Sequence, residues 1–148
     1  MKKAFFSVVL VLALGLATAV FAAESEAQER AARIHLVFDG GEAVVVLDRH
    51  PACMDLLSLL PVTLTFEDYN RTEKISYLPR KLETGSSPDR CDPSEGSFTY
   101  YAPWGNLAVF YRDFRHSEGL VPLGRVESGL EAFSRMNGEF SVRMERME

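Results

Sequence analysis

The residues best suited to hold another molecule are tyrosines, a tryptophan and arginines in the second half of the chain: Tyr77, Arg80, Tyr101, Trp104, Tyr111 and Arg112. Such residues anchor binding sites more often than others do. Trp104 stands between Pro103 and Gly105, at the expected tip of a hairpin, where a bulky side chain is harder to bury than in mid-strand. The set predicts a site for a peptide or a small molecule beside Trp104 and Arg80. The competing interpretation of each aromatic residue is a place in the hydrophobic core.

Other reactive side chains form no recognisable metal or catalytic pattern. His50 and Cys53 have a workable spacing for metal ligands, and the candidates that would complete a set are Cys91, Asp92 and His116. A structural zinc site, however, normally shows closely paired ligands in both halves. The serines lie outside any strand–turn–helix elbow of the kind that presents a nucleophile. The sequence therefore predicts no metal and no cofactor.

The carboxylates that lie close together in the sequence are interpreted as surface residues. Glu67, Asp68 and Glu73 fall at the ends of expected strands, where acidic residues are common for solubility. They therefore carry no prediction of acid–base catalysis.

The N-terminus has the pattern of an export signal. A short basic start is followed by an uncharged, mostly apolar stretch over residues 4–23, and residues 20–22 offer small or medium side chains at the positions that a signal peptidase reads. This predicts a signal peptide over residues 1–22, cleaved after Ala22, and a protein that is periplasmic or secreted. The alternative is an uncleaved anchor, because such a stretch is long enough to span a bilayer. After cleavage we expect no stable membrane insertion.

Charge excludes one large class of partners. The full chain has a formal net charge of −5 at pH 7, and loss of residues 1–22 removes Lys2 and Lys3 but no acidic residue, which gives −7. We expect no nucleic-acid partner, because an acidic chain without a basic stripe cannot neutralise phosphates. The rest of the chain is long enough for one compact domain.

Cys53 and Cys91 are the two cysteines of the chain. Outside the cytoplasm, an even pair is most simply a disulfide. The bond would stabilise the fold by roughly 4 kcal/mol in the chain-entropy description. The sequence thus predicts a Cys53–Cys91 disulfide, with two free thiols as the alternative.

The elements that must position these side chains are mostly strands. Residues 23–32 are polar without an apolar stripe, which indicates a tether, and the domain is expected over residues 33–146. Helical spacing between Pro51 and Pro61 predicts a short apolar helix. Strand patterns and a second helical turn at 130–133 complete the domain, with the strands at 34–38, 42–47, 62–67, 74–78, 98–102, 107–111, 123–126 and 140–144 and a turn at 103–106. About eight short strands favour a closed barrel, because closure removes exposed edges.

Two segments stand out within this plan. The hairpin over residues 98–111 has large side chains on both faces, so one face can fill a core and the other must cover another part of the fold or a ligand. Residues 79–96 form the longest stretch without periodicity. Loops this long in a compact domain usually either have a function or are held in place by contacts such as a disulfide.

Several segments resemble a known family. Residues 65–69 (TFEDY), 77–82 (YLPRKL) and 100–108 (YYAPWGNLA) resemble the small bacterial cyclophilin-like proteins. Residues 34–60 and 123–131 (LGRVESGLE) are similar to the opening and the closing segments of cyclophilins. The resemblance covers nearly all of residues 33–146. It implies a mainly β fold, a closed eight-stranded cyclophilin-like β-barrel with two short capping helices.

The departures from the family bear on function. Prolyl isomerases of the cyclophilin type carry an arginine on a strand reading Phe-His-Arg, followed by a Gln-Gly-Gly segment, and this chain contains neither motif. Arg80, beside Pro79, is the nearest chemical equivalent. The resemblance thus implies a non-enzymatic module that binds a peptide or a small ligand. The alternatives are a divergent peptidyl-prolyl isomerase that acts on exported proteins through Arg80, and an ancillary domain with no ligand of its own.

Overall fold

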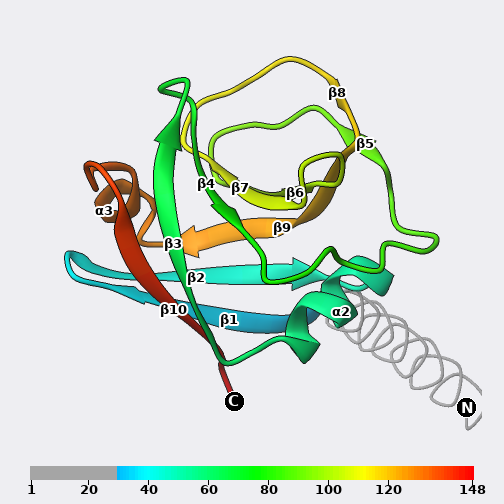
Figure 1. The fold of residues 1–148 in the computed structure, drawn as a ribbon, viewed down its shortest axis with the longest axis horizontal. Helices are drawn as coiled ribbons and strands as arrows, with labels where there is room; N and C mark the ends of the chain where they lie inside the picture. The colour runs from blue at the N-terminus through cyan, green and yellow to red at the C-terminus, as the bar shows by residue number, and fades with distance from the viewer. Residues whose placement is uncertain (1–29) are drawn as a thin grey trace, which may run out of the picture. The chain divides into compact units, whose positions relative to one another are not determined.

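The computed structural model describes residues 30–148, which form a β-barrel with two short helices (Figure 1). The barrel strands are β1 (Arg30–Phe38), β2 (Gly41–Asp48), β3 (Val62–Tyr69), β4 (Glu73–Tyr77), β6 (Ser97–Tyr101), β7 (Asn106–Phe110), β9 (Leu120–Ser128) and β10 (Phe140–Arg146). They close in the order β1-β10-β3-β4-β7-β6-β9-β2, with every pair antiparallel. The predicted fold class, a closed eight-stranded barrel, is confirmed.

The remaining elements are a small sheet and the two helices. Strands β5 (Arg90–Cys91) and β8 (Ser117–Glu118) pair only with each other, and the helices are α2 (Pro51–Ser58) and α3 (Leu130–Ser134). The predicted signal peptide lies outside the described residues, as does most of the predicted tether. Strand β1 begins at Arg30, so residues 30–32, which the sequence assigns to the tether, belong to the first strand. Among residues 30–148, no helix is both long enough and apolar enough to cross a membrane.

The two helices cover different ends of the barrel in Figure 1. Helix α3 lies beside the β1–β2 turn, and its Phe133 ring packs edge-on against Phe38 and Phe66 at centroid distances of 5.4 and 5.3 Å. Helix α2 starts with Pro51 at its first turn and buries one side, including Cys53 and Leu56, in the same core. Helices this short form only because the barrel holds their apolar face.

The β6–β7 hairpin fulfils the prediction that both of its faces are covered. All five residues of β7 are buried. Leu107 and Val109 belong to the main core inside the barrel, whereas Ala108 and Phe110 join a second hydrophobic cluster with Ile75 and Leu120. Because side chains alternate along a strand, this second cluster lies on the outer face of the barrel wall.

The predicted disulfide is absent from the structure, where Cys53 and Cys91 are both free thiols. Cys53 is fully buried in the main core and its thiol donates a hydrogen bond to the Leu123 carbonyl at 3.2 Å. Cys91 lies on β5 and packs against the outer cluster. The two cysteines are thus built into different hydrophobic clusters, which the sequence could not reveal. Burial raises the pKa of the Cys53 thiol to about 12 and that of Cys91 to about 11.

We expect a thiol reagent to count two free cysteines in the unfolded chain without any reductant. In the native protein Cys91 should react first, because Cys53 has no exposed surface. Ellman titration of native and urea-unfolded chain measures both. An unfolded chain with no titratable thiol would instead support the predicted Cys53–Cys91 disulfide.

Strand β9 pairs with β6 on one side and with β2 on the other, and it contains one position that only glycine can occupy. Gly124 pairs with Phe98 of β6 and with Leu47 of β2. A Cβ atom on Gly124 would lie 2.0 Å from the Val46 carbonyl oxygen and 2.9 Å from the Leu47 Cα. The backbones of β9 and β2 therefore approach too closely for any side chain at this point.

We predict that Gly124→Ala lowers the free energy of unfolding by about 3 kcal/mol, because the added methyl group must push two barrel strands apart. Urea unfolding measures the loss. Gly138→Ala is the control, since Gly138 also has a positive φ, of 63°, but no neighbouring atom within 4 Å. It should cost about 1 kcal/mol. Equal losses in the two variants would show that backbone conformation, and not steric contact, decides the effect.

Candidate functional site

A row of side chains from neighbouring strands lines a concave site on the outer face of the barrel wall. Glu73 of β4 is paired in register with Tyr69 of β3 on one side and with Phe110 of β7 on the other. Further along β7, Asn106 pairs with Tyr101 of β6. These five residues contribute to the lining of one pocket of about 440 Å³. We call it the outer-face pocket, and its lining is Tyr69, Asn70, Glu73, Tyr101, Trp104, Asn106, Phe110, Phe114, Arg115, His116, Ser117, Glu118 and Leu120.

Trp104 forms one wall of the outer-face pocket. The turn between β6 and β7 is held by two hydrogen bonds, because the amides of Trp104 and Gly105 both donate to the Tyr101 carbonyl, at 3.3 and 2.9 Å. The Trp104 ring stands nearly perpendicular to Tyr69 and to Tyr101, with centroids 5.7 and 5.4 Å apart. Its exposed fraction is 47%, so the ring is available to a ligand.

The opposite wall is the segment that follows β7. Phe114 stacks on Phe110 with centroids 6.1 Å apart, and the Arg115 guanidinium lies 4.6 Å from the centre of the Phe114 ring. This segment runs into β8, which pairs with β5, and it arches over β6 and β7 in Figure 1. The Gly119 amide also donates to the Asp89 carbonyl at 2.7 Å. The long stretch 79–96 is therefore pinned as expected, by strand pairing instead of by a disulfide.

Two polar side chains of the pocket, Glu73 and Asn106, carry oxygen atoms that have no hydrogen-bond partner among residues 30–148. Glu73 is half-buried, and burial together with the negative charge of Asp68 raises its pKa to about 7. Its carboxylate makes no hydrogen bond or ion pair with any residue of the described chain. Asn106 is 2% exposed, and while its Nδ2 donates to the Leu107 carbonyl at 3.1 Å, its Oδ1 is buried without a hydrogen-bond partner. Native proteins rarely leave such groups unpaired.

The residues that the sequence proposed as a single binding site are divided among several places. Tyr101 and Trp104 line the outer-face pocket. Tyr77 is 56% exposed and lines a different surface groove with Leu78 and Pro79. The sequence missed Glu73 and Asn106, although the alternation of Glu73, Ile75 and Tyr77 on one face of β4 offered a signal for the acid.

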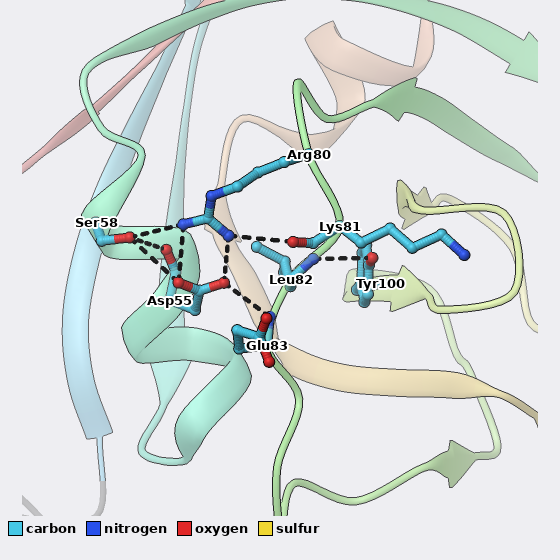
Figure 2. Close-up of polar contacts among 7 residues, drawn as sticks. All are labelled: Asp55, Ser58, Arg80, Lys81, Leu82, Glu83 and Tyr100. Carbon is cyan, nitrogen blue, oxygen red and sulfur yellow. Dashed lines mark hydrogen bonds and ion pairs between the residues drawn. The ribbon is translucent and has the colours of Figure 1, made fainter.

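Arg80 is held by helix α2 (Figure 2) and does not line the outer-face pocket. Its guanidinium donates two hydrogen bonds to the Asp55 carboxylate, at 2.6 and 2.9 Å, and a third to the Ser58 hydroxyl at 3.2 Å. Asp55 also accepts from the Glu83 amide at 2.8 Å. The hydrogen bonds from Arg80 are the main cause that lowers the pKa of Asp55 to about 2. This cluster fastens the segment after β4 to α2.

Tyr111 belongs to a second polar network. Its hydroxyl donates to Asp68 Oδ1, which also pairs with Lys74 Nζ at 3.1 Å. Lys74 is 3% exposed and donates to the Met136 carbonyl at 2.7 Å. Burial and the bond to Asp68 raise the pKa of Tyr111 to about 12. Arg112 lies 5.9 Å from the centre of the Tyr111 ring. The network joins β3, β4 and the turn after α3, and none of its members lines the pocket. Glu73, the sequence neighbour of Lys74, does line it.

The closed barrel, its strand order and its two end helices define a cyclophilin-like protein. The sequence model of the cyclophilin-like family matches residues 36–145, and the chain belongs to that family. Its structure is similar to the solution structure of the hypothetical protein AF2241 from Archaeoglobus fulgidus, with a TM-score of 0.65, 19% identity, and coverage of 78% of this chain and 95% of the archaeal one. That likeness concerns the fold alone. No curated protein matches the chain.

We predict that Asp55→Ala lowers the free energy of unfolding by about 1 kcal/mol, a modest loss because solvent screens a pair whose arginine is 45% exposed. The loss should be complete above pH 4, since the pKa of Asp55 is lowered in the folded state, and it should shrink as the pH falls toward 2. Urea unfolding from pH 7 to pH 2 measures it. Asp39→Ala, at an exposed turn position, is the control and should show no such trend.

Proposed function

We propose that this chain is an exported, non-enzymatic member of the cyclophilin-like family that binds a peptide side chain or a small ligand in the outer-face pocket. The observation that carries the proposal is a concave site walled by aromatic rings on the barrel sheet, whose lining includes the Glu73 carboxylate and an Asn106 Oδ1 atom without a hydrogen-bond partner. Ligand sites typically combine apolar or aromatic walls with polar groups that fix the orientation of the ligand, and this lining combines five aromatic rings with polar side chains. Export rests on the predicted signal peptide of residues 1–22, which would place the module in the periplasm or outside the cell.

The construction of the pocket supports binding by a preformed site. Its floor consists of barrel strands, and its two walls are a tight turn and a segment tied down by the β5–β8 pair. A site whose walls are already ordered loses little conformational entropy when a ligand enters. This favours a binding role over a surface that must rearrange.

The alternative, a divergent prolyl isomerase, depends on Arg80. Because Arg80 is engaged by Asp55 and Ser58 and lies outside the lining of the outer-face pocket, no described contact favours that role. We expect no isomerisation of Xaa-Pro peptides by the full chain in a protease-coupled assay. Catalysis that disappears in Arg80→Ala would overturn the non-enzymatic proposal.

We predict that Trp104→Ala abolishes binding and shifts the unfolding temperature by only a few degrees, because the ring is half exposed. Three probes with one phenyl body test binding: 4-phenylbutylamine, 4-phenylbutyrate and 4-phenyl-1-butanol. Ligand-observed NMR with the full chain measures it, and at least one probe should bind.

The matched control is Tyr77→Ala, which removes an exposed aromatic side chain outside the pocket lining and should leave binding unchanged. Failure of all three probes to bind would contradict the proposed function. A large decrease in the unfolding temperature of Trp104→Ala would show that the side chain stabilises the fold as a core residue does. In that case Trp104→Phe, which keeps an aromatic ring, tests binding in a folded protein.

A further inference from the structure

We propose that the outer-face pocket selects ligands that present a positively charged nitrogen with N–H donors, an organic ammonium or guanidinium group, on an apolar body. The inference rests on the proposed function and names the chemical class of its ligand. It follows from the unpaired polar atoms, from the aromatic walls and from the placement of the charged residues around them.

The unpaired polar atoms call for hydrogen-bond donors. The Asn106 Oδ1 atom is an acceptor, and so is the Glu73 carboxylate in its ionised form. A buried acceptor without a partner costs free energy that a donor from a ligand recovers. An ammonium or guanidinium group supplies donors together with a charge opposite to that of Glu73, and charge-assisted hydrogen bonds are the stronger kind.

The aromatic side chains suit a cation. Trp104 meets Tyr69 at 86° and Tyr101 at 77°, so the three rings form a corner instead of a parallel stack. The face of an aromatic ring attracts a cation, and tryptophan does so best. Tyr69 is 41% exposed and Trp104 is 47% exposed, so both rings retain surface for a ligand.

The basic residues of the lining have anionic or aromatic neighbours of their own. Arg115 lies over the Phe114 ring, and His116 Nδ1 lies 3.0 Å from Asp92 Oδ1. Glu118, which also lines the pocket, pairs with Arg90 at 3.1 Å. Among residues 30–148, Glu73 is thus the one ionisable side chain of the lining that makes no hydrogen bond, ion pair or ring contact with another residue.

Affinity for a cation should rise with pH. Glu73 packs beside Tyr69 of β3 and Phe110 of β7, and the charged or titratable groups around it are Asp68, Tyr111, Arg115, His116 and Glu118. Because the pKa of Glu73 is raised to about 7, the carboxylate is protonated below that pH and ionised above it. An ammonium ligand that pairs with the carboxylate therefore binds more tightly above neutrality.

The test uses the same three phenyl probes with the full chain, titrated by calorimetry at pH 6 and pH 8. At pH 8 the 4-phenylbutylamine cation should bind about tenfold more tightly than the neutral alcohol, and 4-phenylbutyrate should bind weakest. Glu73→Gln should remove most of the preference for the amine, together with its dependence on pH.

Two controls separate a direct contact from general charge effects. Glu67→Gln removes an exposed acid from the neighbouring strand outside the pocket lining and should leave amine binding unchanged. His116→Gln removes the imidazole side chain of the lining and should keep the pH dependence. The unfolding temperature of Glu73→Gln should not fall, because the substitution removes a half-buried carboxylate without breaking any pair.

Two sources supply this chemistry, a free organic amine and the lysine or arginine side chain of a peptide. N-acetyl-lysine-methylamide and a lysine-centred alanine pentapeptide distinguish them: tighter binding of the pentapeptide indicates a peptide ligand, and equal binding indicates recognition of the amine itself. Equal affinity for the three phenyl probes, or an amine preference that survives Glu73→Gln, would overturn the inference and leave the proposed function standing. Absence of all binding would contradict both.

Discussion

Strand β7 is buried on both faces, and the rest of the structure follows from that constraint. Its inward side chains fill the barrel, and its outward side chains, Ala108 and Phe110, need a second covering layer. The segment after β7 supplies that layer through Phe114, and the β5–β8 pair holds the segment in place. The cover is incomplete beside Trp104, and the space left there is the outer-face pocket. The pocket is thus the part of an apolar surface that the chain itself leaves open.

Adjacent charged residues on β4 show how the same strand serves stability and recognition. Lys74 is almost fully buried and is satisfied by Asp68 and the Met136 carbonyl. Glu73 lies on the opposite face and has no such partner. A charged residue that is buried and paired contributes to the unique packing of the fold, whereas one that is partly buried and unpaired is retained at a cost in stability. Violations of this kind concentrate at functional sites.

The sequence predicted the barrel, both helices and the hairpin with two covered faces, because alternation and turn residues act locally. Two of the predicted site residues, Tyr101 and Trp104, line the outer-face pocket, in keeping with the argument that the tip of a hairpin is hard to bury. The sequence did not predict that Arg80 pairs with Asp55, 25 residues away in the sequence, or that the two cysteines lie in different clusters. Pairings over such separations depend on the register of the closed barrel. Composition and periodicity do not encode that register.

The barrel wall is a single strand thick at β4, so a charge in the polar network of Lys74 acts on the pocket beside it. Asp68 belongs to the network of Lys74 and Tyr111, yet its negative charge contributes to the raised pKa of Glu73 in the pocket. A change that neutralises Asp68 would therefore lower the pKa of Glu73 and ionise the pocket acid at a lower pH. The polar network and the pocket share one electrostatic field, so a charge in that network adds to the effect of burial on the acidity of a pocket that it does not line.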